Sequence, residues 1–198
     1  MSQKSPNPDL DKDLSSNDVE VVKITRNWLK EWVIGLNLCP FAKAELVKNR
    51  IRFAITQAQN EEDLLSALRD EFEILDAQAG IETTLLIHPQ CLADFYQYNQ
   101  FLTRAEQLLS DLDLAGIYQL ASFHPNYQFA GTAPDDVENY TNRSPYPLLH
   151  ILRETSLDRV LEHYPEPERI PEQNIERLNA MEEKEIYSLL GKSFDEDE

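Results

Sequence analysis

The sequence is poor in the residues that form phosphate-binding loops and disulfide frameworks. It has five glycines in 198 residues, and none of the spacings GxGxxG, GxxxxGK[ST] or GxSxG occurs. Its two cysteines, Cys39 and Cys91, are far apart and neither belongs to a CxxC pair. This argues against a disulfide and against a structural zinc site, and it leaves two thiols.

Positive charge is also scarce. The chain has 18 lysines and arginines against 36 aspartates and glutamates, which gives a net charge of −18 and an isoelectric point near 4.5. Nucleic acids and anionic membrane surfaces need a basic face, so we expect neither as a partner. An acidic surface is typical of a soluble protein, and an acidic docking face for a protein partner is the alternative.

Long apolar runs are missing as well. No stretch approaches the roughly 18 apolar residues of a membrane span. The first 18 residues are polar and have no apolar segment typical of a signal peptide. We therefore expect a cytoplasmic protein.

The composition predicts one domain between two acidic ends. Residues 1–17 are rich in Ser, Asn, Pro and Asp without periodicity, which predicts a flexible tail. Residues 192–198 are expected to fray. Residues 18–191 form the remaining single domain, and a hydrophobic content of 41% over the whole chain is enough for one core.

Hydrophobic periodicity predicts an α/β fold. Expected strands at 51–57, 82–88 and 116–124 are separated by expected helices at 61–78 and 91–113. Helical crossovers favour parallel pairing, so we predict a small parallel three-stranded βαβαβ sheet. Additional N- and C-terminal helices should flank it: one capped by Ser16 or Asn17 and ending near Asn37, one over 148–163, and one over 172–190.

The candidate site is the long polar stretch 122–154, whose aromatic residues argue against disorder. It opens at His124, which follows the third predicted strand as His88 follows the second. The carboxyl ends of parallel strands share the edge where open α/β sheets bind ligands, so both histidines should lie there. His124 is the expected general acid or base. Alternatively, each His-Pro pair only ends its strand.

Further residues of the stretch suit catalysis or anion binding. Asp135 and Asp136 are adjacent carboxylates that can divide acid and base roles or cap a helix. Arg143 suits a carboxylate or phosphate, or pairs with one of these aspartates. His150 is a further catalytic candidate, and it shares a predicted helix face that is expected to point at the loop. The expected ligand-binding residues are Arg143, Asn142, Ser144, Thr132, Arg153 and Asn126.

Cys39 lies in the sequence NLCPFA, just before an expected helix start. Unpaired N–H groups there lower a thiol pKa, which makes Cys39 a candidate nucleophile; a buried structural thiol is the alternative. The histidines and aspartates are suitable metal ligands, but no local spacing such as HExxH marks a site. We predict no metal, and no cofactor follows from the sequence.

The stretches NLCPFA, FHPNYQFAG and DDVENYTNRSPYPLLHILRE together resemble a bacterial family catalogued as domain of unknown function 1415. The resemblance covers residues 19–190. It implies a bacterial cytosolic protein, and it implies that these motifs are the defining features of the family. It implies no activity, substrate or cofactor.

These observations lead to one main expectation and two alternatives. We expect a small-molecule enzyme whose polar site is built from the 122–154 loop at the carboxyl edge of the sheet, with an anionic ligand bound through Arg143. The first alternative is a non-catalytic module that binds a metabolite or peptide. The second is a structural or protein-interaction protein whose polar loop is architectural, because such side chains also satisfy loop backbone.

Overall fold

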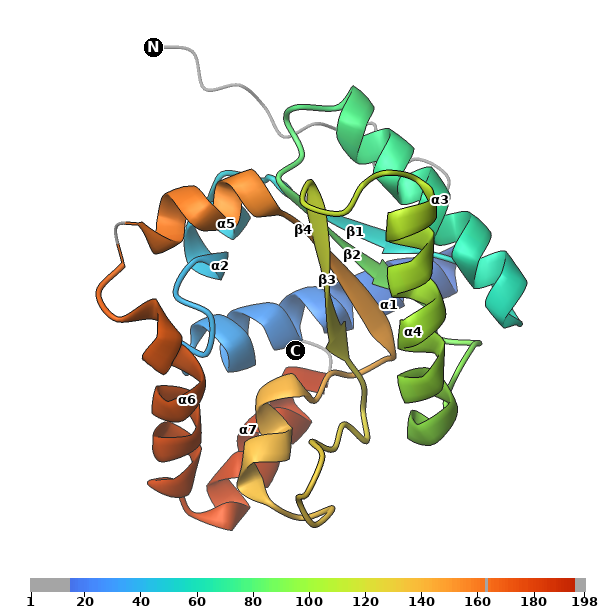
Figure 1. Cartoon of the computed structure of the whole chain (residues 1–198). Coiled ribbons are helices and arrows are strands. Elements are labelled where there is room, and N and C mark those ends of the chain that lie inside the picture. The colour runs from blue at the N-terminus through green and yellow to red at the C-terminus, as the bar shows by residue number, and fades with distance from the viewer. Residues whose placement is uncertain (1–14, 163, 195–198) are drawn as a thin grey trace.

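A four-stranded mixed sheet lies at the centre of the computed structural model, which describes residues 15–162 and 164–194 (Figure 1). Its strand order is β1-β2-β4-β3. β1 and β2 pair in parallel, whereas β4 is antiparallel to both of its neighbours. The strands are β1 Ile51–Ile55, β2 Thr83–Ile87, β3 Tyr118–Phe123 and β4 Leu148–Arg153.

The expected α/β character is confirmed, but the three-stranded parallel sheet is wrong. β1, β2 and β3 do run in one direction, yet β4 lies between β2 and β3 and runs the other way. The helix expected over 148–163 is the source of the error, since only α5 (Glu154–Leu161) is helical there. The run LLHIL is a central strand, and a short apolar run cannot be told from a buried helix by periodicity.

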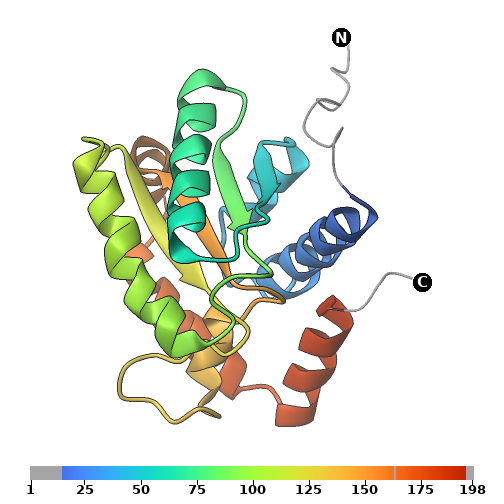
Figure 2. The same cartoon turned by 90° about the vertical axis from the view of Figure 1, so that its right-hand side faces the viewer.

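Helices cover both faces of the sheet (Figure 2). α3 (Glu61–Ala77) and α4 (Phe95–Asp111) cover one face. α1 (Ser16–Trp28), its π-helical continuation Leu29–Ile34 and α7 (Glu183–Phe194) cover the other. Successive strand residues alternate between the two cores, as Leu85 and Leu86 do. Every residue of β2 is therefore buried.

The remaining elements are short. α2 (Ala42–Val47) follows the NLCP loop, and a short 3₁₀ helix (Val137–Asn142) lies inside the polar stretch. The helix expected over 172–190 is two helices, α6 (Ile170–Asn179) and α7, preceded by a turn at Pro167–Arg169.

The two expected acidic ends fall mostly outside the described residues, which omit 1–14 and 195–198. Ser16 and Asn17 belong to α1. The N-cap is Ser15, one residue before the expected cap, and its hydroxyl accepts from the Asp18 N–H in a capping box.

Gly35→Ala is expected to lower the free energy of unfolding by about 1–3 kcal/mol. Gly35 closes the π-helical turn, where its N–H donates to the Lys30 carbonyl at 3.0 Å. A Cβ at this position would overlap the carbonyl oxygen of Glu31. Gly191→Ala is the matched control, because a Cβ on this exposed helical residue meets nothing. Urea denaturation should show a clear loss only for Gly35→Ala; equal stabilities would contradict the close packing.

Candidate functional site

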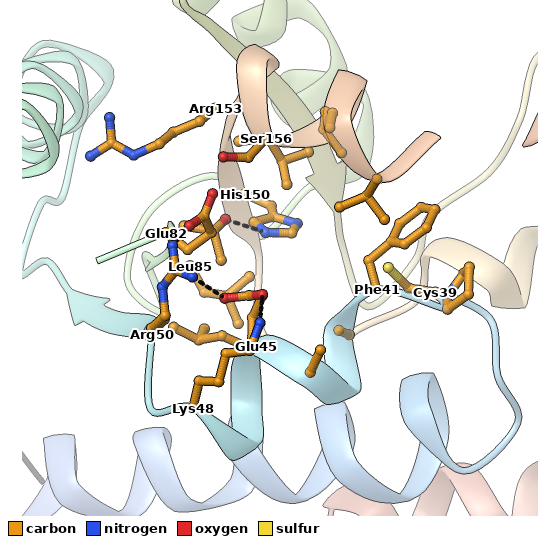
Figure 3. A pocket seen from close by; sticks show the side chains of 18 of the residues that line it. Cys39, Phe41, Glu45, Lys48, Arg50, Glu82, Leu85, His150, Arg153 and Ser156 are labelled. Atoms are coloured by element: carbon orange, nitrogen blue, oxygen red, sulfur yellow. Dashed lines mark hydrogen bonds and ion pairs between the residues drawn. The ribbon is translucent and has the colours of Figure 1, made fainter. Parts of the chain in front are cut away.

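A pocket of about 340 Å³ opens on the α1 face of the sheet, at the amino ends of β1 and β2 (Figure 3). Strand residues form its floor, and α5 and the segment that includes α2 form its walls. This edge is opposite to the carboxyl edge where the site is expected from the sequence. Much of the lining is apolar and includes Leu29, Phe41, Leu85, Leu152, Leu157 and Val160.

His150 is the polar group on the pocket floor, and its tautomer follows from its partners. Its Nε2 lies 2.7 Å from the Thr83 hydroxyl oxygen, which lies 2.6 Å from the carbonyl oxygen of Ile151. A carbonyl can only accept, so the single hydroxyl proton is donated to Ile151. Thr83 must then accept from the Nε2–H of His150. The Nδ1 atom carries the lone pair, and no described residue donates to it.

Burial lowers the pKa of His150 to about 4. The ring is therefore neutral at pH 7, although it is partly exposed where it lines the pocket. In this state it can accept a hydrogen bond at Nδ1 and cannot donate one there.

Cys39 also lines this pocket, from the loop before α2. The N–H groups of Phe41 and Ala42 act on the thiol and lower its pKa, as expected for a cysteine before a helix. Burial outweighs them, so the net pKa of Cys39 is raised. The thiol is protonated at neutral pH, which favours the alternative of a buried structural thiol over a resting thiolate.

Paired charges line another part of the pocket. Arg50 bridges two carboxylates, with its Nη1 3.4 Å from Glu45 and its Nη2 in contact with Glu82. Lys48 donates to the other oxygen of Glu45 at 3.1 Å. The second oxygen of Glu82, Oε1, is buried and has no hydrogen-bond partner within the described chain.

Helix α6 holds the loop that carries Cys39. Asn174 donates to the carbonyl of Leu38 at 2.8 Å. Arg177 donates to the carbonyl of Asn37 at 2.9 Å and also to that of Leu36. A wall of the pocket therefore depends on residues some 140 positions further along the chain.

His88 and His124 do lie together at the carboxyl edge, as expected, and both contact the Tyr98 ring. The His88 and His124 ring centroids are 5.8 and 5.1 Å from that of Tyr98. His124 is fully buried; its Nδ1 accepts from the N–H of Asn126 at 3.0 Å, and its Nε2 donates to the Leu92 carbonyl at 3.1 Å. Both nitrogens are occupied, which leaves none for acid-base chemistry in this conformation.

His88 has a different balance of contacts. Its Nδ1 donates to the Cys91 carbonyl at 2.9 Å, whereas its buried Nε2 has no partner in the described part of the chain. Burial lowers the pKa of His88 to about 4. His88 is thus a neutral core histidine that holds the turn after β2. Cys91 is also buried, and burial raises its pKa.

The polar side chains of the 122–154 stretch bond mainly to the stretch itself. Arg143 donates to the Pro134 carbonyl at 2.6 Å and lies 3.9 Å above the Tyr140 ring, with no ion pair to Asp135 or Asp136 in the described structure. The exposed Asp136 accepts from the Ala133 N–H. The remaining side chains bond nearby: Ser144 to the Tyr146 carbonyl, Asn142 to the Ser122 carbonyl, and Thr132 to Phe129 and Asn139. Asn126 and Asp135 are exposed.

The chain matches a known protein family over most of its length. Residues 20–188 match the family described as a protein of unknown function, DUF1415. The chain belongs to this family. The resemblance seen in the sequence is thereby confirmed, and comparisons with curated proteins and with solved structures gave no match.

Arg153 is the clearest correction among the expected site residues. Its guanidinium donates to Tyr118 Oη at 3.0 Å, to the Ile81 carbonyl at 3.4 Å and to the Leu75 carbonyl at the end of α3. Residues three apart share a helix face but lie on opposite faces of a strand. Because residues 148–153 form β4, Arg153 points away from His150 and from the loop.

The structure brings Cys39, His150 and Arg153 to the lining of one pocket, although the Arg153 guanidinium bonds to Tyr118 and Leu75. The other expected catalytic and loop residues do not line this pocket. Sequence reasoning missed four residues that belong to no motif: Glu45 inside α2, Arg50 before β1, Glu82 just before β2 and Thr83 at its start. Only the pairing of Thr83 with β4 could have indicated its contact with His150.

The described residues contain neither a cluster of metal ligands nor a helix that could span a membrane. Within residues 15–162 and 164–194, no three His, Cys, Asp or Glu side chains are grouped to hold a metal ion. In the same ranges, every helix is too short or too polar to cross a membrane.

Proposed function

We propose that the protein binds a small, largely apolar organic molecule in the pocket between α2, α5 and the sheet. The observation that carries the proposal is the neutral His150, which Thr83 fixes with the Nδ1 lone pair free within an apolar lining. Small-molecule sites combine such linings with a few oriented polar groups, in volumes of about 300–1,000 Å³. The volume of about 340 Å³ suits a compact ligand.

Binding is better supported than proton transfer. A general base works best when its pKa lies near the working pH, and burial holds the pKa of His150 at about 4. The raised pKa of Cys39 likewise disfavours a thiolate–imidazolium pair. The expected enzyme is the second candidate, favoured by one observation: Cys39 and His150 line the same pocket.

Anion binding through Arg143 is less supported than binding in the pocket. The guanidinium donates to the Pro134 carbonyl through one nitrogen and lies over the Tyr140 ring, contacts that hold the stretch together. The geometry therefore favours the architectural explanation of the loop that the sequence left open.

Ala44→Trp is expected to weaken binding of neutral probes such as 1-hexanol and phenol by at least about tenfold, because an indole fills the pocket that Ala44 lines. Lys43→Trp is the matched control, since Lys43 is exposed on the same helix and is not part of the lining. Thermal shift and calorimetry should show binding to the wild type and to Lys43→Trp. Equal binding by Ala44→Trp would place the probes elsewhere. Turnover of a bound compound, lost in Cys39→Ser, would favour the enzyme.

A further inference from the structure

We infer that the polar group of the ligand is a hydrogen-bond donor, an amine or amide N–H, and not a carboxylate or phosphate. The inference rests on the proposed function of the same pocket. It concerns the selectivity of the pocket and depends on which of its polar atoms still lack a partner.

Glu82 supplies the first such atom. One carboxylate oxygen contacts Arg50, while Oε1 is buried without a donor, and the side chain is only 12% exposed. A buried acceptor without a donor is costly, and a ligand N–H can satisfy it once the Glu82 side chain rotates to expose Oε1 to the pocket. Figure 3 shows Glu82, Ser156 and His150 together at one end of the pocket.

His150 supplies the second. Its Nε2–H is committed to Thr83, so the neutral ring presents only a lone pair at Nδ1. The apolar side chains of the lining carry no polar atom, and the Ser156 hydroxyl and the Cys39 thiol can each accept as well as donate. The unsatisfied capacity of Glu82 and His150 is therefore acceptor capacity, and it calls for donors on the ligand.

The cations of the lining are already engaged. Arg50 lies between Glu45 and Glu82, and Lys48 donates to Glu45 while its side chain is 55% exposed. Arg159 already has an interaction partner. The Arg153 guanidinium donates to Tyr118 and Leu75 on the far side of the sheet. A carboxylate ligand would face two acceptors and would have to displace an existing ion pair.

Three probes with the same six-carbon chain isolate the head group: hexylamine, hexanamide and hexanoate. At pH 7.5 we expect hexylamine and hexanamide to bind the wild-type protein at least about tenfold more tightly than hexanoate, with matching shifts in melting temperature. Glu82→Gln turns an acceptor position into one that can donate, so it should reduce this preference to less than about threefold. Glu106→Gln, an exposed change on α4, should leave the preference unchanged.

The outcomes separate the two proposals. Hexanoate binding as tightly as hexylamine to the wild type would overturn the inference and leave the pocket as a binding site. Failure of all three probes to bind, together with no effect of Ala44→Trp on 1-hexanol or phenol, would overturn the proposed function as well. The wild-type comparison decides the question even if Glu82→Gln does not fold.

Discussion

Acidification from pH 7 to pH 4 should remove roughly 3 kcal/mol of folding free energy through His88 alone. Its pKa is lowered from an ordinary value of 6.5 to about 4 because the ring is fully buried. Desolvation at the pocket floor lowers the pKa of His150 to about 4 as well, which adds a loss of the same sign. The pKa of His124 is also lowered by burial.

The direction follows from proton uptake. Above pH 6.5 the imidazoles of His88 and His150 are neutral in both the folded and the unfolded state, so their contribution is constant. Between pH 6.5 and 4 the unfolded chain binds a proton at each site and the folded chain does not. Stability therefore falls over this interval, by about 1.4 kcal/mol per pH unit for each such histidine, and levels off below pH 4.

Urea denaturation at pH 7.5, 6.5, 5.5 and 4.5 measures this loss. His88→Asn retains a donor for the Cys91 carbonyl and removes one titrating group, so its stability should depend less steeply on pH than that of the wild type. NMR titration of the imidazole Cε1 protons reports the pKa values directly. A midpoint near 6.5 for His88 would contradict its burial as a neutral ring.

Asn139→Ala should lower the free energy of unfolding by roughly 3 kcal/mol, because four hydrogen bonds of one buried side chain are lost at once. Asn139 is fully buried at the centre of the polar stretch. Its side-chain oxygen accepts from the Phe129 N–H at 2.9 Å and the Thr132 hydroxyl at 2.8 Å. Its amide donates to the carbonyls of Ala133 at 2.7 Å and Pro134 at 3.3 Å.

Asn139→Asp is the isosteric test of these contacts. The aspartate oxygen can still accept the two hydrogen bonds from Phe129 and Thr132. The NH2 group that donates to Ala133 and Pro134 is lost and a charge is buried, so this change should also be strongly destabilising. Asn126→Ala, at an exposed position in the same stretch, should change stability by less than about 0.5 kcal/mol. Hydrogen exchange at the Phe129 amide should become faster only in the Asn139 variants. Unchanged exchange would show that the loop keeps its shape without this residue.

Local patterns in the sequence determined most of the elements. The alternation over 51–55 and the stripe over 61–77 depend on neighbouring residues, and Asn60 and Asp94 cap α3 and α4 as short-range signals allow. The placement of His88 and His124 at one edge also followed from the sequence, because the two strands they follow run in the same direction.

Local sequence patterns did not determine the composition of the pocket. Cys39 and His150 are far apart in sequence, and they line one pocket only because β4 enters the sheet between β2 and β3. The same strand carries Arg153 to the opposite face and brings Thr83 to His150. Pairing with β2 and β3 satisfies the backbone of residues 148–153, and burial on both faces leaves apolar residues at 148, 149, 151 and 152 without a regular alternation. Periodicity is therefore lost there, and only tertiary structure distinguishes strand from helix.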